Sequence, residues 1–251
     1  MTASIEKSSL RDQVVLITGG ARRVGAEIVR TLHAAGAKVL IHYRSSSAAA
    51  ITLADELNRS RPGSAAIHAA NLLTAGAAET LVAATLMEFG RLDVLINNAS
   101  SFYPTPVGQI THAQWDDLIG SNLKAPLFMA QAAAPGLRAQ HGLIINMVDI
   151  HALRPLKAYP VYSTAKAGLA MLTRSLAREL GPEIRVNGIA PGPVLWPEGE
   201  TDEASKREII DKTALKRPGT PQDVARTALF LAQDAPYITG QIIAVDGGRS
   251  I

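Results

Sequence analysis

The sequence predicts an α/β fold, a single doubly wound domain in which a seven-stranded parallel sheet carries helices on both faces. Short β-rich stretches alternate with longer helical ones along the whole chain. Several of the short stretches are continuously apolar, as parallel strands covered on both faces are. No repeat, low-complexity tract or Pro/Gly-rich linker interrupts this alternation, so we expect residues 1–251 to form one domain.

The expected strands comprise residues 14–18, 38–43, 65–69, 94–97, 143–148, 185–190 and 241–245. The helices between them have recognisable ends. Thr111 and Gln114 have the spacing of a capping box, and Thr220 places a capping hydroxyl before a proline at the first helical position. Gly36 and Gly90 suit the C-terminal ends of helices.

Composition excludes several classes of function. The chain has no cysteine, which excludes disulfides, thiol nucleophiles and cysteine-ligated metals. Its six histidines are never three or four residues apart, so we expect no metal site. A net charge of +3, with basic residues at most in pairs, argues against a nucleic-acid face. The N-terminus lacks the apolar core of a signal peptide and no apolar run is long enough for a membrane span, so we expect a cytoplasmic protein.

Tyr162 and Lys166 are four residues apart, which places both side chains on one face of a helix. A free phenol has a pKa of about 10, and we expect a lysine ammonium beside it to favour the phenolate and to lower the pKa of Tyr162. Such a pair can pass a proton while a hydride arrives elsewhere on the substrate. The spacing alone is common; the alternative is a solvated lysine and a half-buried tyrosine that merely share a helix face.

A glycine-rich turn, TGGARRVGAEI, leaves the first strand and opens a helix. Gly19, Gly20 and Gly25 would let the backbone approach a pyrophosphate, which the helix N-terminus attracts. Tight turns need glycine in any case, but the strand–turn–helix context favours a dinucleotide site. Within this turn we expect Arg23 to contact the pyrophosphate, the substrate or both through its forked donors; the alternative is that it points to solvent.

The second strand ends in IHYRSSS, without the acid that would bind a ribose 2′-hydroxyl. Arg44 and Ser45 stand where a 2′-phosphate would lie, and His42 lines the same place. Because no carboxylate repels that phosphate, we expect NADP(H) to be the cofactor. The alternative is that Arg44 is an incidental loop residue.

These features together resemble the short-chain dehydrogenase/reductase family along nearly the whole chain. The landmarks are Thr18-Gly19 with Gly25, Asn97-Asn98-Ala99, Asn122, Tyr162-x-x-x-Lys166, Pro191-Gly192 and the C-terminal stretch RPGTPQDVARTALFLAQDAPYITGQIIAVDGG. The resemblance implies a Rossmann-type fold. It also implies a homotetramer or dimer that forms through the two long helices holding Asn122 and Tyr162.

The resemblance assigns roles to individual residues. The implied catalytic residues are Asp149, Tyr162, Lys166 and Asn122. In the family, the residue matching Asn122 supports a water that links the lysine to solvent, Asn97 and Ala99 border the adenosine, and Pro191 and Gly192 flank the nicotinamide. The implied cofactor-binding residues are Gly19, Arg23, Val24, His42, Arg44, Ser45, Asn71, Leu72, Asn98, Ala99, Ser100, Tyr162, Lys166, Pro191 and Gly192.

Three departures from the general family pattern resemble the pteridine reductases. Asp149 stands in place of the family's catalytic serine, Arg23 replaces a glycine of the first turn, and the usual NNAG is here NNASSFYPTP, residues 97–106. The sequence MVD followed by Arg154-Pro155-Leu156 is similar to that subfamily as well. One departure from the subfamily is Asn71, which occupies an adenine-contacting position that is usually an aspartate.

The chemistry of a ring C=N bond is consistent with these changes. A serine hydroxyl suits a carbonyl substrate, because it donates to the developing alkoxide. Reducing C=N instead requires a proton on nitrogen, which Asp149 beside Tyr162 would hold or relay if burial favours its protonated form. The alternative is a structural aspartate in a dead site.

Substrate contacts follow from the resemblance. Phe102 stacks on the pterin and sandwiches it against the nicotinamide, and Ser101 and Arg23 supply polar contacts. Residues 193–212 form a substrate lid, in which Trp196 either lines the pocket or anchors the lid. The implied substrate-binding residues are Arg23, Ser101, Phe102, Asp149, Tyr162 and Trp196.

The sequence thus predicts an NADPH-dependent reductase that transfers a hydride to a pteridine ring, from a dihydropterin, an oxidised pterin or dihydrofolate to the tetrahydro form. One rival is a ketone or 3-oxoacyl-thioester reductase of the same family, against which the missing serine argues. The other is a catalytically silent NADP-binding sensor or scaffold, against which the retained Tyr162, Lys166 and Asn122 argue.

Overall fold

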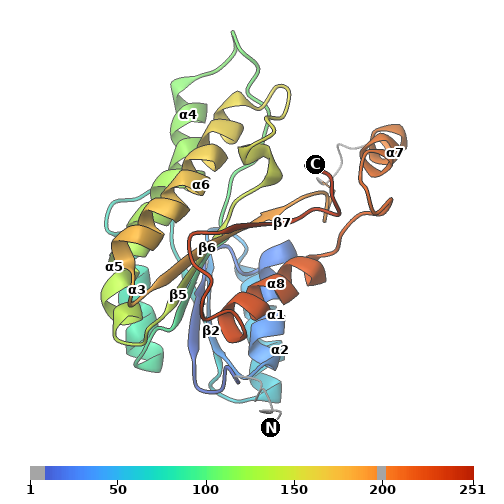
Figure 1. The fold of residues 1–251 in the computed structure, drawn as a ribbon. Coiled ribbons are helices and arrows are strands. Elements are labelled where there is room, and N and C mark those ends of the chain that lie inside the picture. Colours follow the sequence, from blue (N-terminus) through green and yellow to red (C-terminus); the bar gives the residue numbers. More distant parts are fainter. Residues whose placement is uncertain (1–8, 197–201) are drawn as a thin grey trace.

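A computed structural model describes residues 9–196 and 202–251. Within these ranges one sheet of seven strands runs in the order β3-β2-β1-β4-β5-β6-β7, and every neighbouring pair is parallel (Figure 1). The strands are β1 (Val14–Ile17), β2 (Lys38–Tyr43), β3 (Ala65–Ala69), β4 (Val94–Asn97), β5 (Leu143–Met147), β6 (Arg185–Pro191) and β7 (Ile242–Val245). The predicted fold class is confirmed, and each predicted strand is present with ends that differ by at most one residue.

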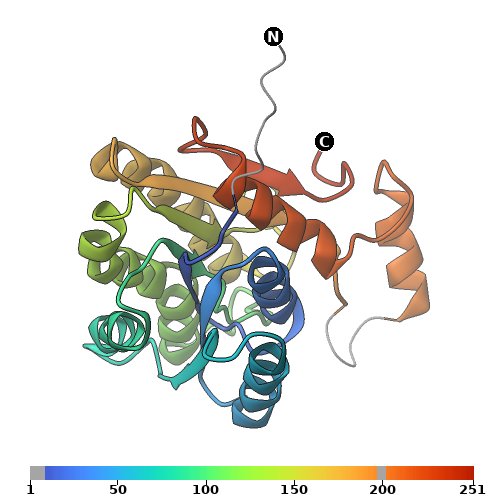
Figure 2. The same ribbon diagram turned by 90° about the horizontal axis from the view of Figure 1, so that it is seen from below.

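Helices cover both faces of the sheet (Figure 2). They are α1 (Arg23–Ala34), α2 (Ser47–Ser60), α3 (Ala77–Phe89), α4 (His112–Ile119), α5 (Ala125–Arg138), α6 (Pro160–Leu180), α7 (Glu203–Asp211) and α8 (Pro221–Gln233), with a π-helical turn η1 (Gly120–Lys124) and a 3-10 turn η2 (Ile150–Ala152). Helices α1, α2 and α8 pack on one face, and α3, α5 and α6 pack on the other.

The strands face two separate cores because successive side chains point to opposite faces of a sheet. In β1, Val15 and Ile17 lie in the core under α1 and α8, whereas Leu16 lies in the core under α3 and α5. All three are fully buried. This is why the strands read as continuous apolar runs rather than as alternating ones.

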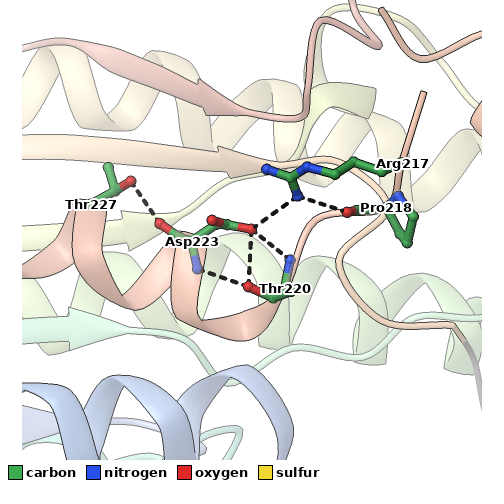
Figure 3. Close-up of polar contacts among 5 residues, drawn as sticks. All are labelled: Arg217, Pro218, Thr220, Asp223 and Thr227. Atoms are coloured by element: carbon green, nitrogen blue, oxygen red, sulfur yellow. Dashed lines mark hydrogen bonds and ion pairs between the residues drawn. The ribbon is translucent and has the colours of Figure 1, made fainter. Parts of the chain in front are cut away.

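The capping box predicted at Thr111 and the capping hydroxyl predicted at Thr220 are both present, and Thr220 too forms a full capping box. At the start of α8 (Figure 3), Thr220 Oγ1 accepts the Asp223 N–H at 3.3 Å, and Asp223 Oδ2 accepts the Thr220 N–H at 2.8 Å. An ion pair between Arg217 and Asp223 adds to this cluster. Thr111 caps α4 in the same way. Because α8 packs on α1, the Thr220 cap supports the helix that follows the glycine-rich turn.

The order of the strands reverses between β1 and β4, which are neighbours in space although two strands separate them in the chain. In doubly wound sheets ligands bind in the crevice at this switch point, beside the carboxyl ends of the strands. The turns that follow β1, β4 and β5 meet there. They hold the residues that the sequence singles out.

Helix α7 stands apart from the sheet and its covering helices (Figures 1 and 2), and none of its residues is buried. It lies within the segment predicted to be a lid, residues 193–212. Residues 197–201 of that segment lie outside the described residues. Among the described residues, no helix is both long enough and apolar enough to cross a membrane.

Candidate active site

An open cleft of about 400 Å³ lies at the switch point of the sheet. Its wall contains most of the residues that the sequence predicts for the cofactor and substrate: Gly19, Arg23, Val24, His42, Arg44, Asn71, Leu72, Asn98, Ala99, Ser100, Ser101, Asp149, Tyr162, Lys166 and Pro191. Seven residues with a predicted role at the site lie outside this wall: Gly20, Ser45, Asn97, Phe102, Asn122, Gly192 and Trp196. Segments far apart in the sequence are thus brought together in one place.

The glycine-rich turn packs against the loop after β4 so closely that only glycine fits. A Cβ atom on Gly25 would lie 2.4 Å from the Gly19 carbonyl oxygen and 2.7 Å from Asn98 Nδ2. Asn98 Nδ2 donates to the Gly19 carbonyl at 2.8 Å, and Thr18 Oγ1 accepts the N–H groups of Asn98 and Ala99. The turn is therefore fixed before any ligand arrives, with its backbone exposed to the cleft.

Arg23 adopts a left-handed backbone conformation, with φ of +54°. This conformation explains why the family has a glycine at the position, since an L-residue with a side chain is strained there. The guanidinium donates to the carbonyl oxygen of Trp196 at 3.1 Å. Arg23 therefore bridges the turn after β1 and the segment after β6, and it is the Trp196 backbone, not its ring, that makes this contact.

His42, in β2, links the turns after β1 and β3 through two hydrogen bonds. Its Nδ1 accepts the Gly19 N–H at 3.1 Å, so the proton of a neutral ring is on Nε2, which donates to the Ala70 carbonyl at 3.0 Å. Burial lowers the pKa of His42, which keeps the ring neutral. His42 thus shapes the cleft, and the positive charge in this part of the wall comes from Arg22, Arg23 and Arg44.

Tyr162 and Asp149 are directly hydrogen-bonded. The Tyr162 hydroxyl donates to Asp149 Oδ2 at 2.7 Å, and Asp149 Oδ1 accepts the His151 N–H at 2.8 Å. The tyrosine is only 5% exposed. Burial, and then the charge and hydrogen bond of Asp149, raise the pKa of Tyr162 well above its ordinary value.

The expectation that Lys166 lowers the pKa of Tyr162 is therefore wrong for the protein without ligands. Lys166 Nζ donates to the Met147 carbonyl at 2.8 Å and lies 5.7 Å from the centroid of the Tyr162 ring. Burial lowers the pKa of Lys166 to about 8, an effect that Asp149 opposes. Burial and the carboxylate outweigh the ammonium, so Tyr162 is a protonated donor.

Asn122 lies in the π-helical turn η1, a distortion frequent at functional sites. Its Nδ2 donates to the carbonyls of Ser101 at 2.9 Å and Leu118 at 3.0 Å. Its buried Oδ1 has no hydrogen-bond partner among the described residues, which fits a bound water. Asn97, expected to border the adenosine, instead buries its side chain and donates to Asn146 Oδ1 at 2.9 Å.

Phe102 lies beside the cleft and is 43% exposed. Its ring stacks on Tyr159, with centroids 4.7 Å apart and an interplanar angle of 17°. It also makes a T-shaped contact with the Tyr162 ring, with centroids 4.8 Å apart. A partly exposed, oriented aromatic ring therefore stands next to Tyr162.

Several residues of the wall were not predicted from the sequence: Arg22, Ala70, Leu73, Ser121, Ala125, Met147 and Val148. Arg22 was detectable from its position next to Arg23 in the turn. Most of the others are small or apolar residues that define the shape of the wall, and nothing in their residue type distinguishes them in the sequence. Tyr159 was missed too, because its contact with Phe102 joins two distant loops. Among the described residues, no group of three or more His, Asp or Glu could hold a metal ion.

The fold and the site define a dinucleotide-dependent oxidoreductase. A family model described as enoyl-(acyl carrier protein) reductase matches residues 19–250. The chain is 40% identical to pteridine reductase 1 of Leishmania tarentolae, over 95% of this chain and 96% of that protein. It is 34% identical to a 3-oxoacyl-(acyl-carrier-protein) reductase of Synechocystis sp., over 96% and 98% of the two chains.

A solved structure gives the same picture. The crystal structure of a blue fluorescent protein from a metagenomic library, in complex with NADPH, matches with a TM-score of 0.91 at 32% identity, over 97% of this chain and 100% of that one. A short-chain type dehydrogenase/reductase of Picea abies is 34% identical over 96% of this chain. The chain belongs to the short-chain dehydrogenase/reductase family.

Proposed function

We propose that this protein is an NADPH-dependent reductase that transfers a hydride to the ring of a pteridine, either a dihydropterin, an oxidised pterin or dihydrofolate. The observation that carries the proposal is the 2.7 Å hydrogen bond from the Tyr162 hydroxyl to Asp149, where ordinary members of the family have a serine. The 40% identity to a pteridine reductase supports it.

The cleft fits NADPH. Gly19 and Gly25 leave a cradle that a Cβ atom would fill, and the N-terminus of α1 faces it. Arg22 and Arg23 stand beside this cradle for the pyrophosphate, and Arg44 follows β2, where the ribose 2′-phosphate would lie. When bound there, the cofactor supplies the hydride.

The residues of this chain supply the proton. Tyr162 is protonated, because burial and Asp149 raise its pKa, and it would donate to the ring nitrogen next to the carbon that accepts the hydride. Asp149 orients the hydroxyl through Oδ2 and would relay a replacement proton to the phenolate. Lys166, an ammonium below about pH 8, would hold the ribose and stabilise the phenolate. Asn122 would hold a water through its unpartnered Oδ1.

A flat heteroaromatic ring suits the geometry of the site. Phe102 is 43% exposed beside Tyr162, and a pterin would pack against its ring. Ser101 lines the wall next to it, and Arg23 stands close to the mouth. A carbonyl on a flexible acyl chain would use neither the aromatic face nor the carboxylate.

The test is the oxidation of NADPH with dihydrobiopterin, dihydromonapterin, dihydrofolate, biopterin and an acetoacetyl thioester, each measured by the loss of NADPH absorbance. Turnover of a pterin or of dihydrofolate with a silent thioester is the expected result. Thioester turnover with silent pterins would show that the protein is a 3-oxoacyl reductase, as the 34% identical relative from Synechocystis sp. is named.

A silent NADP-binding protein is the remaining rival. The Tyr162→Phe variant removes the proton donor and keeps the ring that packs against Phe102. Loss of turnover in this variant, with NADPH binding retained, would exclude a merely scaffolding role. A wild-type protein that binds NADPH and reduces none of the five compounds would favour it.

Two further features belong to the proposal. The chain forms a homotetramer or dimer through α5 and α6, whose exposed apolar side chains include Phe128 and Met171. Residues 193–212 act as a substrate lid, to which Arg23 connects through Trp196. Light scattering coupled to gel filtration measures the assembly, and a monomeric mass would contradict it.

A further inference from the structure

The ring of Tyr159 covers one face of Phe102 in a nearly parallel stack, with centroids 4.7 Å apart. Tyr159 lies just before Pro160, the first residue of α6, and it precedes Tyr162 by one helical turn. Phe102 comes from the loop after β4. Two loops that are remote in sequence thus place three aromatic rings together at the edge of the cleft.

The loop that carries Phe102 is held on both sides of that residue. The Ser101 carbonyl accepts from Asn122 Nδ2 at 2.9 Å, and the Tyr103 hydroxyl donates to Asp117 Oδ2 at 3.0 Å. Buried Thr105 donates its N–H to the Ala158 carbonyl at 2.7 Å, directly before Tyr159. This last bond fixes the Phe102 loop against the Tyr159 segment.

The backbone of Tyr159 is equally well fixed. Its N–H donates to the Leu156 carbonyl at 3.1 Å, and its carbonyl accepts the Ser163 N–H at 3.0 Å. The following proline restricts its φ and ψ further. The backbone that carries the Tyr159 ring is therefore held in place, and the Phe102 ring stacks on this ring.

We propose that Tyr159 is a positioning residue that fixes the plane of Phe102, so that a flat ring packed against the exposed part of Phe102 lies in reach of Tyr162. This inference rests on the proposed pteridine reductase function, and it adds a residue that touches Phe102 rather than the reacting atoms. Without the support, the Phe102 ring would turn about its side-chain bonds, and the stacked ring would lose a defined orientation.

The test compares Tyr159→Leu, which removes the ring, with Tyr159→Phe, which keeps the ring and removes only the hydroxyl. For Tyr159→Leu we expect the KM and the dissociation constant for dihydrobiopterin to rise about three- to tenfold, as loss of one aromatic contact predicts. Tyr159→Phe should restore wild-type values. The dissociation constant for NADPH and the melting temperature control for damage to the fold.

The possible outcomes separate the two proposals. An unchanged KM for dihydrobiopterin in Tyr159→Leu, with normal wild-type turnover, would overturn the role of Tyr159 and leave the function intact. Tighter binding in that variant would overturn it as well, since Tyr159 would then obstruct the site. A wild-type protein that neither binds nor reduces dihydrobiopterin, dihydromonapterin, dihydrofolate or biopterin would overturn the function and, with it, this inference. An equal loss in Tyr159→Phe would assign the effect to the hydroxyl and contradict the support by the ring.

Discussion

Replacement of Asp149 by serine tests the proton relay directly. The carboxylate reaches the Tyr162 hydroxyl at 2.7 Å. A serine side chain is one bond shorter, so its oxygen would stand roughly 4 Å away, beyond hydrogen-bonding distance. A hydrogen bond to a charged group contributes about 1.5–3 kcal/mol, equivalent to about 10- to 150-fold in rate. General acid–base catalysis by a positioned group contributes about 10²- to 10⁴-fold.

We therefore expect Asp149→Ser to lower kcat for dihydrobiopterin by about 100-fold or more, while the dissociation constant for NADPH changes little. Asp149→Asn is the matched control. Its amide oxygen keeps the bond to the His151 N–H and its volume is unchanged, but it cannot take up a proton. If Asp149 acts in the relay, the asparagine variant should lose activity nearly as severely as the serine variant.

Steady-state NADPH oxidation gives kcat and KM, and a spectroscopic titration of tyrosinate gives the second readout. Because the Asp149 charge is one of the causes that raise the pKa of Tyr162, that pKa should fall in both variants relative to wild type, with Tyr162→Phe identifying the signal. If kcat stays within about threefold of wild type in both folded variants, Asp149 is structural and the reasoning fails.

Three other predictions follow from single contacts. Lys166 is an ammonium below its pKa of about 8 and a neutral amine above it, so the dissociation constant for NADPH should rise as pH increases through about 8. This inflection should vanish in the Lys166→Met variant. A flat wild-type profile would contradict the assignment. Arg23→Gly relieves a left-handed backbone strain of about 1 kcal/mol and should raise the melting temperature by about 2–4 °C, even though the variant loses the hydrogen bond to the Trp196 carbonyl. The affinity of this variant for NADPH or the pterin should fall. Unchanged affinity for both ligands would show that Arg23 is not part of the site. Thr220→Ala removes a helix cap worth about 1 kcal/mol and should lower the melting temperature by about 2–4 °C without changing KM. Hydrogen bonds from Thr220 hold the pKa of Asp223 below its ordinary 3.8, so the stabilisation they provide is complete above that pH and is lost as pH falls below it. Calorimetry at neutral and acid pH should therefore show that the difference in melting temperature between wild type and Thr220→Ala becomes smaller at acid pH.

The strands were predictable because a parallel sheet covered on both faces demands continuous apolar runs. In β4, Val94, Leu95 and Ile96 are all buried, alternately in the two cores. The strand ends were less certain, because they depend on where a ladder partner stops. Thr18, expected in β1, instead leaves the sheet and accepts the N–H groups of Asn98 and Ala99.

The candidate site was predictable where one residue type carries the chemistry, as in the glycine turn and the Tyr162–Lys166 pair. The direction of the Tyr162 pKa shift could not be predicted, because it depends on how deeply the hydroxyl is buried and on which partner each polar group contacts. Lys166 uses its ammonium on the Met147 carbonyl, and Asp149 takes the phenol. The stack of Tyr159 on Phe102 was equally hidden, since no periodicity links two distant loops.

Three residues at this crevice each carry a local cost that folding alone does not explain. Arg23 occupies a left-handed position where glycine would be relaxed, Asp149 places a carboxylate against a buried phenol, and Phe102 is an aromatic residue that is 43% exposed. They come from the turns after β1, β5 and β4, so no single element requires all three. Such costs persist where function compensates for them. A flat, nitrogen-containing ring that binds a guanidinium, stacks on an aromatic face and accepts a proton at nitrogen would use all three at once, whereas an acyl thioester would use none.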